Sequence, residues 1–397
     1  MTNDATHRPS VAILADDLSG AAEAASAFLG RLPAPALHLQ PGGLRHEGVT
    51  VVDLNTRTVP KTQAQNAVRR ALDGIPPRVM VLAKVDSLLR GHVGPWAEVL
   101  AERGPVVVAA ALPALGRTVR GGVLHVEGLP LHQTRAWHAE RSSPPASVAD
   151  LFAEHPTVTT RPTPDLADRL EQAAASGRIA VCDVAADADL DLILAASKAI
   201  PGVQLMGTSA LAAAVARTMP AGSDDAPPRR ESPALLTVVG TAEPVAAQQV
   251  TELIRVGTRH LALDADELLG GSANPSRLAR ALVDGSVVVT VVGAVRPDLT
   301  EPMSAALARF VAFGQTASRP DLMLTGGATA RAVVDAIGLT TLHPVGQVHH
   351  GAVVSVASDG RTVVTRPGSF GDRFSLVDVA RHLAEPPSVR TQPKALT

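Results

Sequence analysis

Four side chains that can hold ions and hydroxyl groups occur within seven positions of the chain, from Lys84 to Arg90. They lie in the segment Lys-Val-Asp-Ser-Leu-Leu-Arg-Gly, which directly follows the apolar run 79–83. Lys84 and Arg90 can bind anions, while Asp86 and Ser87 can contact hydroxyl groups. If the apolar run is a buried parallel strand, these side chains leave its carboxyl end, where open α/β sheets bind their ligands. Only four of the 36 lysine and arginine residues are lysines, so the general composition of the chain does not explain a lysine directly after this apolar run.

Polar groups also follow two other apolar runs in the first half of the chain. Asp16 and Asp17 come directly after the run 11–15, and Arg57 comes shortly after the run 49–54. An aspartate at a helix start is commonly a cap or a partner of the helix dipole, so one of the two acids could be structural. If Asp17 faces a ligand, it can accept a proton from a hydroxyl group. Arginine can bind a carboxylate or a phosphate through two parallel hydrogen bonds.

Each of these groups has a structural explanation when it is taken alone. Lys84 could neutralise Asp86 within a loop, and Arg57 could lie on the surface. Three strand ends that all carry polar groups are harder to explain in this way, because the carboxyl ends of parallel strands meet at one edge of a sheet. The sequence therefore predicts a site for a small anionic molecule with hydroxyl groups.

A glycine pair, Gly326 and Gly327, lies between an expected strand and an expected helix in the second half of the chain. Free N–H groups at a helix start can form a phosphate cradle with the positive end of the helix dipole. The pair lacks the spacing of a Walker A loop or a dinucleotide fingerprint, and a tight turn would use the same glycines. Thr241 ends another expected strand, and residues 366–371 form a second glycine loop. Together these features suggest a nucleotide site.

The elements that must position these residues alternate along the chain. Short β-branched or aliphatic runs alternate with longer amphipathic runs, as in a doubly wound sheet. A polar, proline-rich linker at 220–233 interrupts the pattern. The sequence therefore predicts an α/β protein of two doubly wound domains, 1–219 and 234–391, with mostly parallel sheets and a cleft between them, followed by a disordered tail at 392–397. Glycine, proline and histidine punctuate residues 112–134, which predicts a hairpin-like excursion.

The expected strands are Val11–Ala15, Val49–Leu54, Val79–Ala83, Val106–Ala110, Ile179–Val184, Val203–Met206, Leu235–Val239, His260–Leu263, Val287–Val292 and Leu322–Thr325, with a closing hairpin of Val353–Ser355 and Thr362–Arg366. Amphipathic helices are expected between them.

Composition narrows the class of protein. A chain of 397 residues is too long for one ordinary core and fits two domains. The net charge of −2 and the lack of long basic runs argue against a nucleic-acid partner. No apolar run reaches the ~20 residues that are needed to span a bilayer. Small molecules are therefore the expected ligands, with neither nucleic acid nor membrane as a partner.

The single cysteine, Cys182, excludes an internal disulfide and indicates a reducing compartment. Residues 1–8 lack the basic and apolar regions of a signal peptide. Both features predict a cytoplasmic protein. His343, His349 and His350 have neither a metal-site spacing nor a neighbouring carboxylate, so metal binding by them is not expected.

These motifs, in this order, resemble those of the four-carbon acid sugar kinase family, and matches extend over nearly the whole chain. The family pattern A-D-D-L-T-G-A is matched at 15–21, and K-x-D-S-T-L-R-G is matched at 84–91 with Leu88 in place of threonine. The T-G-G-x-T-A element is matched at 325–330 and the terminal K-x-G-x-F-G element at 366–371.

The resemblance implies an N-terminal domain that binds an acid sugar and a C-terminal domain that binds ATP, with Mg²⁺ carried by the nucleotide. The family's nucleotide positions fall on Thr241, Gly326, Gly327, Ala328, Thr329 and Gly368. Its substrate positions fall on Asp16, Asp17, Arg57, Lys84, Asp86, Ser87 and Arg90. No magnesium ligand is assigned.

The leading hypothesis is an ATP-dependent kinase of carbohydrate catabolism that phosphorylates the terminal hydroxyl of threonate, erythronate or 3-oxo-tetronate. Asp17 is the predicted catalytic residue, with Asp86 as the alternative base, and a homodimer is left open. Departures from the family pattern near Thr241, at Glu243 and Ala246, permit a second hypothesis, a non-catalytic sensor of acid sugar and nucleotide. A nicotinamide-dependent oxidoreductase is disfavoured, because no G-x-G-x-x-G follows the first strand. Leu88 leaves the choice of acid sugar open.

Overall fold

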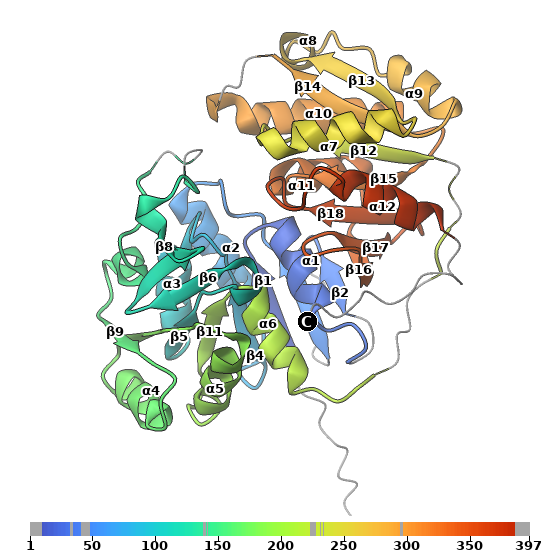
Figure 1. Cartoon of the computed structure of the whole chain (residues 1–397). Coiled ribbons are helices and arrows are strands. Elements are labelled where there is room, and N and C mark those ends of the chain that lie inside the picture. The colour runs from blue at the N-terminus through green and yellow to red at the C-terminus, as the bar shows by residue number, and fades with distance from the viewer. Residues whose placement is uncertain are drawn as a thin grey trace, which may run out of the picture. The chain divides into compact units, whose positions relative to one another are not determined.

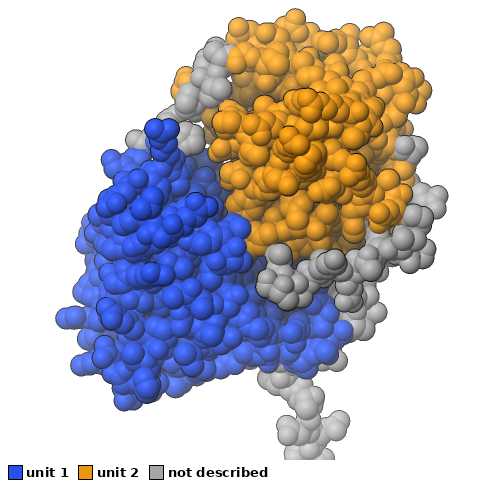
Figure 2. Space-filling view, in the orientation of Figure 1, with its two compact units in different colours: residues 1–224 blue, residues 225–397 orange. Residues whose placement is uncertain are grey.

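The chain divides into two compact units, Met1–Asp224 and Asp225–Thr397 (Figure 1, Figure 2). The computed structural model describes residues 10–31, 35–40, 48–137, 140, 142–222, 228–230, 232, 234–293 and 297–385. The division falls within the segment 220–233 that the composition predicts to be a linker, several residues of which lie outside the described ones. The predicted tail at 392–397 also lies outside them.

Unit 1 is built on a parallel sheet with the strand order β2-β3-β1-β4-β11-β5-β10-β9. Its strands are β1 (Val11–Ala15), β2 (Ala36–His38), β3 (Val49–Asp53), β4 (Met80–Lys84), β5 (Val106–Ala109), β9 (Thr157–Thr160), β10 (Ile179–Cys182) and β11 (Gln204–Gly207). Its helices are α1 (Leu18–Ser26), α2 (Lys61–Asp73), α3 (Val93–Ala101), α4 (Leu166–Ala175), α5 (Asp187–Ser197) and α6 (Ser209–Arg217). Helix α6 contacts α1 and α5, while α2 contacts α3.

Two neighbouring strands of the unit 1 sheet, β1 and β3, are buried along their whole length. Both β1 and β3 are buried at every position, which explains why β1 is a continuous aliphatic run and why apolar and polar residues do not alternate along β3. The register aligns Ala15 at the end of β1 with Asp53 of β3 and with Lys84 of β4. Because these pairs are parallel, the residues that follow the three strands leave the sheet at the same edge.

The predicted hairpin-like excursion is confirmed. An antiparallel sheet in the order β6-β7-β8 occupies this part of unit 1. Its strands are β6 (Arg117–Arg120), β7 (Val123–Val126) and β8 (Leu129–Pro130). A backbone bridge between Val119 and Val184 joins this sheet to the segment after β10.

Unit 2 has the strand order β13-β14-β12-β15-β18-β17-β16. Its strands are β12 (Leu235–Val239), β13 (Arg259–Asp264), β14 (Val287–Val292), β15 (Asp321–Thr325), β16 (Thr341–Gln347), β17 (Val353–Ala357) and β18 (Thr362–Arg366). Its helices are α7 (Pro244–Arg255), α8 (Ala265–Leu269), α9 (Ser276–Val283), α10 (Thr300–Gly314), α11 (Gly327–Ile337) and α12 (Ser375–Ala384). Along the order β13-β14-β12-β15-β18, every neighbouring pair of strands is parallel. Strand β17 is antiparallel to both of its neighbours, β18 and β16.

The predicted α/β class with mostly parallel sheets is confirmed, and each expected strand is present to within one or two residues at its ends. Strands β2, β9 and β16 were not predicted. Among the described residues, every helix is too short or too polar to cross a lipid bilayer.

Candidate active site

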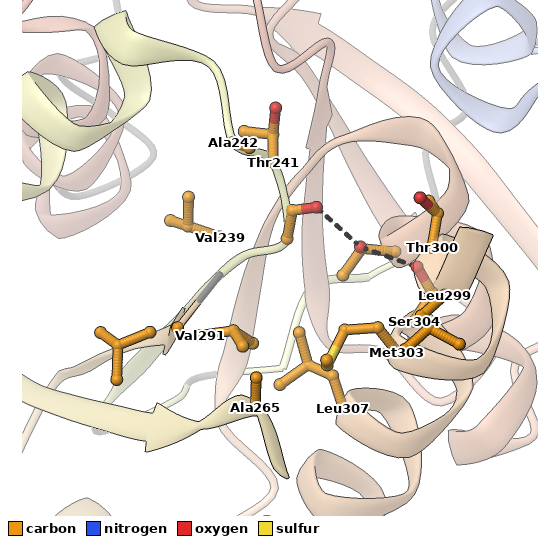
Figure 3. Close-up of a pocket in the computed structure, with 14 residues that line it drawn as sticks. Val239, Thr241, Ala242, Ala265, Val291, Leu299, Thr300, Met303, Ser304 and Leu307 are labelled. Carbon is orange, nitrogen blue, oxygen red and sulfur yellow. Dashed lines mark hydrogen bonds between the residues drawn. The ribbon is translucent and has the colours of Figure 1, made fainter. Parts of the chain in front are cut away.

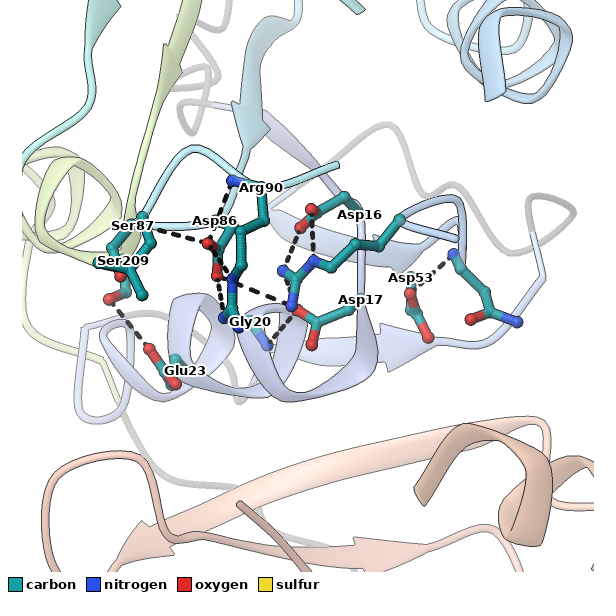
Figure 4. Close-up of polar contacts among 12 residues, drawn as sticks. Asp16, Asp17, Gly20, Glu23, Asp53, Asp86, Ser87, Arg90 and Ser209 are labelled. Carbon is teal, nitrogen blue, oxygen red and sulfur yellow. Dashed lines mark hydrogen bonds and ion pairs between the residues drawn. The ribbon is translucent and has the colours of Figure 1, made fainter. Parts of the chain in front are cut away.

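Polar residues that follow β1, β3 and β4 form one hydrogen-bonded cluster in unit 1 (Figure 4). Arg57 donates from Nε to Asp16 Oδ2 and from Nη2 to Asp16 Oδ1, both at 2.9 Å. Its Nη2 also donates to Asp17 Oδ1 at 2.8 Å, and its Nη1 lies 3.7 Å from Asp86 Oδ1. One guanidinium group therefore links three carboxylates that come from two strand ends.

Asp86 is held in its ionised form. Arg90 binds it through two parallel hydrogen bonds, from Nε to Oδ2 at 2.7 Å and from Nη2 to Oδ1 at 2.8 Å. The backbone N–H of Leu88 also donates to Oδ2 at 3.0 Å. Burial opposes ionisation, but Arg90 and Arg57 outweigh it and hold the pKa of Asp86 well below its ordinary value. A carboxylate held in this way is a poor proton acceptor.

Asp17 lies at the start of α1 and is less fully engaged than its neighbours. It is the N-cap of the helix, and its Oδ1 accepts the backbone N–H of Gly20 at 3.0 Å as well as the Arg57 hydrogen bond. Within the described part of the chain, no hydrogen bond reaches its Oδ2. Asp17 can therefore cap the helix through one oxygen and offer the other to a ligand.

Lys84 is the last residue of β4 and is only 4% exposed. Its ammonium group lies against the first turn of α1, because a Cβ atom added to Gly20 would be 2.3 Å from Lys84 Nζ. Ser87, also buried, accepts a hydrogen bond from Nη1 of Arg117 in β6. Burial lowers the pKa of Arg117, a residue that sequence reasoning did not assign to the site.

Sequence reasoning also missed Glu23. This acid lies on α1, is 8% exposed, and its Oε2 accepts a hydrogen bond from Ser209 Oγ at 3.2 Å (Figure 4). Burial raises the pKa of Glu23, and Lys84 opposes that rise. One feature of the sequence could have indicated Glu23: it is the single acid in a helix that otherwise consists of small and apolar residues.

Replacing Glu23 with glutamine is expected to raise the free energy of unfolding at neutral pH and to change it little below pH 4.5, the ordinary pKa of glutamate. A folded-state pKa above the unfolded value gives stability that is present below the unfolded pKa and is lost as pH rises through the folded pKa. Glutamine keeps an acceptor for Ser209 but carries no charge. Urea unfolding at several pH values measures the difference, and a difference that does not vary with pH would contradict the prediction.

The two tryptophans make this measurement specific, because Trp96 and Trp137 are both buried in unit 1 and their fluorescence reports its unfolding. Glu102→Gln is the matched control. The hydrogen bond from Arg69 lowers the pKa of that exposed acid, so its replacement is expected not to stabilise the protein.

In unit 2, the structure brings together Thr241 and the two predicted glycine loops. A Cβ atom added to Gly368 would be 2.6 Å from Thr241 Oγ1, and one added to Gly326 would be 3.7 Å from Thr241 Cβ. Gly326 has a φ of 95° and immediately precedes α11, whose first turn contains Gly327, Ala328 and Thr329. A side chain is strained at such a φ, so this strand-to-helix turn favours glycine.

A pocket of about 200 Å³ lies beside Thr241 and Thr329. Its lining residues are Val239, Gly240, Thr241, Ala242, Ala265, Val291, Val292, Gly293, Leu299, Thr300, Met303, Ser304, Leu307 and Thr329. Figure 3 shows the hydroxyl groups of Thr241 and Thr300 towards one end and the apolar side chains of Ala265, Val291 and Leu307 towards the other. The pocket thus has a polar end and an apolar end.

Most of this pocket was not predicted from the sequence. Val291 and Val292 are the last residues of β14 and Gly293 follows it, while Met303, Ser304 and Leu307 belong to α10. Ser304 Oγ lies 3.4 Å from Thr329 Oγ1, which in turn donates to Gly240 O at 3.4 Å, so α10 and α11 meet at its polar end. Met303 and Leu307 are one helical turn apart, and this spacing was the feature of the sequence that could have placed them on one face of a helix.

The side chains of Arg366 and Gln249 hold the terminal glycine loop, residues 366–371, through hydrogen bonds to its backbone. Arg366 is fully buried and donates to Gln249 Oε1 at 2.8 Å and to Phe370 O. Gln249 Nε2 donates to Phe370 O at 3.2 Å, Gly371 O at 3.3 Å and Asp372 O at 2.8 Å. Burial lowers the pKa of Arg366 to about 10. Arg366, where the family pattern has lysine, therefore anchors the loop.

We expect Gly368→Ala to weaken nucleotide binding by about tenfold, because the new methyl group must push the glycine loop away from Thr241. Gly346→Ala is the control, since a Cβ atom at Gly346 meets no atom within 4 Å. Calorimetric titration with ATP measures both affinities. Equal affinities for the two variants would show that contact between the loop and Thr241 does not matter for the nucleotide.

The histidines make contacts within unit 2. His349 Nε2 lies 2.6 Å from Ser375 Oγ, and the ring of His350 stacks on Phe370 with 5.7 Å between the ring centroids. Across the ranges that the structure describes, no group of three or more His, Cys, Asp or Glu side chains is arranged to hold a metal ion.

The fold and the two sites define an α/β protein of two units, each with a polar site of its own. Residues 11–215 match the family model of a sugar-binding N-terminal domain, and residues 236–376 match that of a nucleotide-binding C-terminal domain. The chain is a member of the four-carbon acid sugar kinase family.

Similar proteins cover nearly the whole chain or about half of it. A D-threonate kinase from Cupriavidus necator is 30% identical over 92% of this chain and 95% of its own length. A D-erythronate kinase from Heliobacterium modesticaldum is 32% identical over 46% of this chain and 47% of its own length. A solved structure from Salmonella typhimurium LT2 shares the fold, with a TM-score of 0.74 and 20% identity over 94% of this chain and 99% of its own.

Proposed function

We propose that the protein is an ATP-dependent kinase that phosphorylates the terminal hydroxyl of a four-carbon acid sugar in carbohydrate catabolism. Threonate, erythronate and 3-oxo-tetronate are the candidate substrates. Unit 1 binds the acid sugar, and unit 2 binds ATP together with its Mg²⁺. Family membership and the names of the kinase relatives support this proposal.

The observation that carries the proposal is the pattern of hydrogen bonds made by the three carboxylates around Arg57. Both oxygens of Asp16 and both oxygens of Asp86 are bound to arginines, whereas Asp17 offers one oxygen. Asp17 is therefore the group best placed to accept the proton of the attacking hydroxyl. The substrate-binding residues are proposed to be Asp16, Arg57, Lys84, Asp86, Ser87 and Arg90.

The proposed reaction is a single displacement. The hydroxyl oxygen of the acid sugar bonds to the terminal phosphorus of ATP, the bond from that phosphorus to the bridging oxygen breaks, and ADP leaves. The hydroxyl proton passes to Asp17. Phosphoryl transfer asks a protein mainly for positioning and for stabilisation of charge, and the fixed cations of the Arg57 cluster supply both.

Unit 2 offers a matching nucleotide site. The apolar end of its pocket, with Ala265, Val291 and Leu307, suits a purine ring, and Thr241 at the polar end suits the phosphate chain. The proposed nucleotide-binding residues are Thr241, Gly326, Gly327, Ala328, Thr329 and Gly368. The N–H groups in the first turn of α11, which have no acceptor among the described residues, are the expected phosphate donors.

An ADP-release assay over D- and L-threonate, D- and L-erythronate and their 3-oxo derivatives tests the proposed function. We expect turnover with at least one acid and none with threitol, which lacks the carboxylate. Binding of an acid without ADP release would favour the alternative, a non-catalytic sensor. The departure from the family pattern that motivated this alternative, Glu243, is the N-cap residue of α7 and has no side-chain capping bond. Cytoplasmic location and a homodimer stay predictions.

A further inference from the structure

A second polar pocket, of about 350 Å³, lies in unit 1 between the turn that follows β3 and one face of α2. Its lining residues are Leu54, Asn55, Thr56, Val59, Gln63, Asn66, Ala67 and Arg70. The α2 residues among them recur at the spacing of successive helical turns, so they share one face of the helix. None of the lining residues is assigned above to the binding of acid sugar or nucleotide.

The polar side chains of α2 differ in whether the protein itself provides their partners. On the face towards α3, Arg69 donates two hydrogen bonds to Glu102, while Lys61 and Gln65 both donate to Glu98. The pocket face is different. Within the described residues, no hydrogen bond or ion pair reaches the polar side chains of that face, which are Gln63, Asn66 and Arg70.

Thr56 adds a buried hydroxyl group to the lining of this pocket. The residue is 2% exposed, and across the described part of the chain its Oγ1 has no hydrogen-bond partner. Its backbone N–H donates to Asp16 O at 2.9 Å, which fixes the residue at this position. A buried hydroxyl group without a partner is costly unless a ligand satisfies it.

The side chains of the pocket select an anion. Arg70 brings a guanidinium group, the lining amides bring N–H donors, and no carboxylate is among the described residues that line the pocket. A carboxylate ligand offers two acceptor oxygens, whereas a phosphate group offers three strong ones. A phosphate group can therefore use more of these donors, and arginine binds it through two parallel hydrogen bonds.

We propose that the pocket between the turn after β3 and α2 binds a phosphate group. Arg70 pairs with its charge, and Thr56 and the amide side chains donate hydrogen bonds to its oxygens. The ligand is either free inorganic phosphate or the phosphorylated acid sugar, which share this chemistry. The inference goes beyond the proposed function, and only the second source of the phosphate group rests on it.

Calorimetric titration of the full chain with inorganic phosphate, and separately with D-threonate 4-phosphate, tests this site. Arg70→Met removes the charge and is expected to weaken binding of at least one of these probes by about tenfold or more, the effect of losing a charge-assisted hydrogen bond. Arg69→Met is the matched control, because it makes the same change at the next residue of α2, where Glu102 already binds the guanidinium group. It is expected to change neither affinity.

Thr56→Val tests the buried hydroxyl group and is expected to affect stability and binding in opposite directions. Valine has nearly the same shape but no hydroxyl group, so the protein without ligand is expected to unfold at a higher urea concentration. Phosphate binding is expected to weaken by about threefold to tenfold, the effect of losing one neutral hydrogen bond. An unchanged affinity would contradict the assignment of this hydroxyl group to the ligand.

The two probes distinguish the two sources of the phosphate group. An effect of Arg70→Met on inorganic phosphate alone assigns the site to the free anion, and an effect on D-threonate 4-phosphate alone assigns it to the phosphorylated acid. The inference is overturned if Arg70→Met weakens neither probe, or if the wild-type protein binds neither. It is also overturned if Lys84→Met abolishes binding that Arg70→Met leaves unchanged, because the anion then binds in the cluster around Arg57.

Failure of this inference is separable from failure of the proposed function. Arg70→Met is expected to keep normal turnover in the ADP-release assay in phosphate-free buffer. Turnover without any phosphate binding that depends on Arg70 supports the kinase and removes the site. Phosphate binding that depends on Arg70, without turnover of any acid, supports the site and removes the kinase.

Discussion

Asp17→Asn is expected to lower kcat by about 10² to 10⁴, the usual contribution of a general base, and to change the KM for the acid sugar only a few-fold. Asparagine keeps the side-chain oxygen that accepts the N–H of Gly20, so the N-cap of α1 survives. It cannot take up the hydroxyl proton. An ADP-release assay at saturating ATP, with the acid sugar varied, separates kcat from KM.

Asp86→Asn is the matched variant, because it makes the same atomic change 3.7 Å from the same guanidinium group. Its expected effect is different. Arg90 loses its ionised partner, so we expect a higher KM and a lower free energy of unfolding rather than a selective loss of kcat. Near-normal turnover of Asp17→Asn beside an inactive Asp86→Asn would assign the base to Asp86.

The largest stability effect is expected for Arg57→Met, at about 3 kcal/mol. The substitution removes the partner of Asp16, which is 3% exposed and would remain as an uncompensated buried carboxylate. Burial already raises the pKa of Asp16, and Arg57 opposes that rise. Without Arg57, protonation relieves the penalty, so the destabilisation is expected to shrink as pH falls. Urea unfolding followed by tryptophan fluorescence measures it in unit 1.

Arg69→Met is the control for this effect. Arg69 also binds a carboxylate, that of Glu102, through two hydrogen bonds, but both side chains are exposed, at 42% and 53%. Solvent screens a pair of exposed charges, so the loss of stability in this variant is expected to be much smaller. A similar decrease in the free energy of unfolding in both variants would contradict the prediction. It would show that packing of the arginine side chains, rather than compensation of buried charge, stabilises unit 1.

Much of the polar cluster around Arg57 could be predicted because it follows from local sequence. Asp16, Arg57 and Lys84 each lie at or just beyond the end of a buried aliphatic run, and parallel register then brings such ends together. What local sequence could not supply is the partner of each charge. Arg57 and Asp16 are 41 positions apart, and only the register of β1 and β3 shows that this arginine binds a carboxylate of its own chain.

The elements that escaped prediction have weak or mixed patterns. Strand β2 spans three residues, and β16 contains a proline and a glycine around a shift in register. The pocket beside Thr241 and Thr329 escaped prediction for another reason. Met303 and Leu307 look like ordinary core positions of an amphipathic helix, and their contribution to a pocket depends on how α10 packs beside α11.

The contacts of Arg366 and Gln249 with the terminal glycine loop have a consequence for the thermodynamics of nucleotide binding. Three successive carbonyl groups of that loop are already bound to Gln249. A nucleotide that meets a loop already fixed in this way does not have to order it, so less chain entropy is lost on association. Gln249→Ala would shift that ordering to the binding step, and the nucleotide would then bind with a more unfavourable entropy.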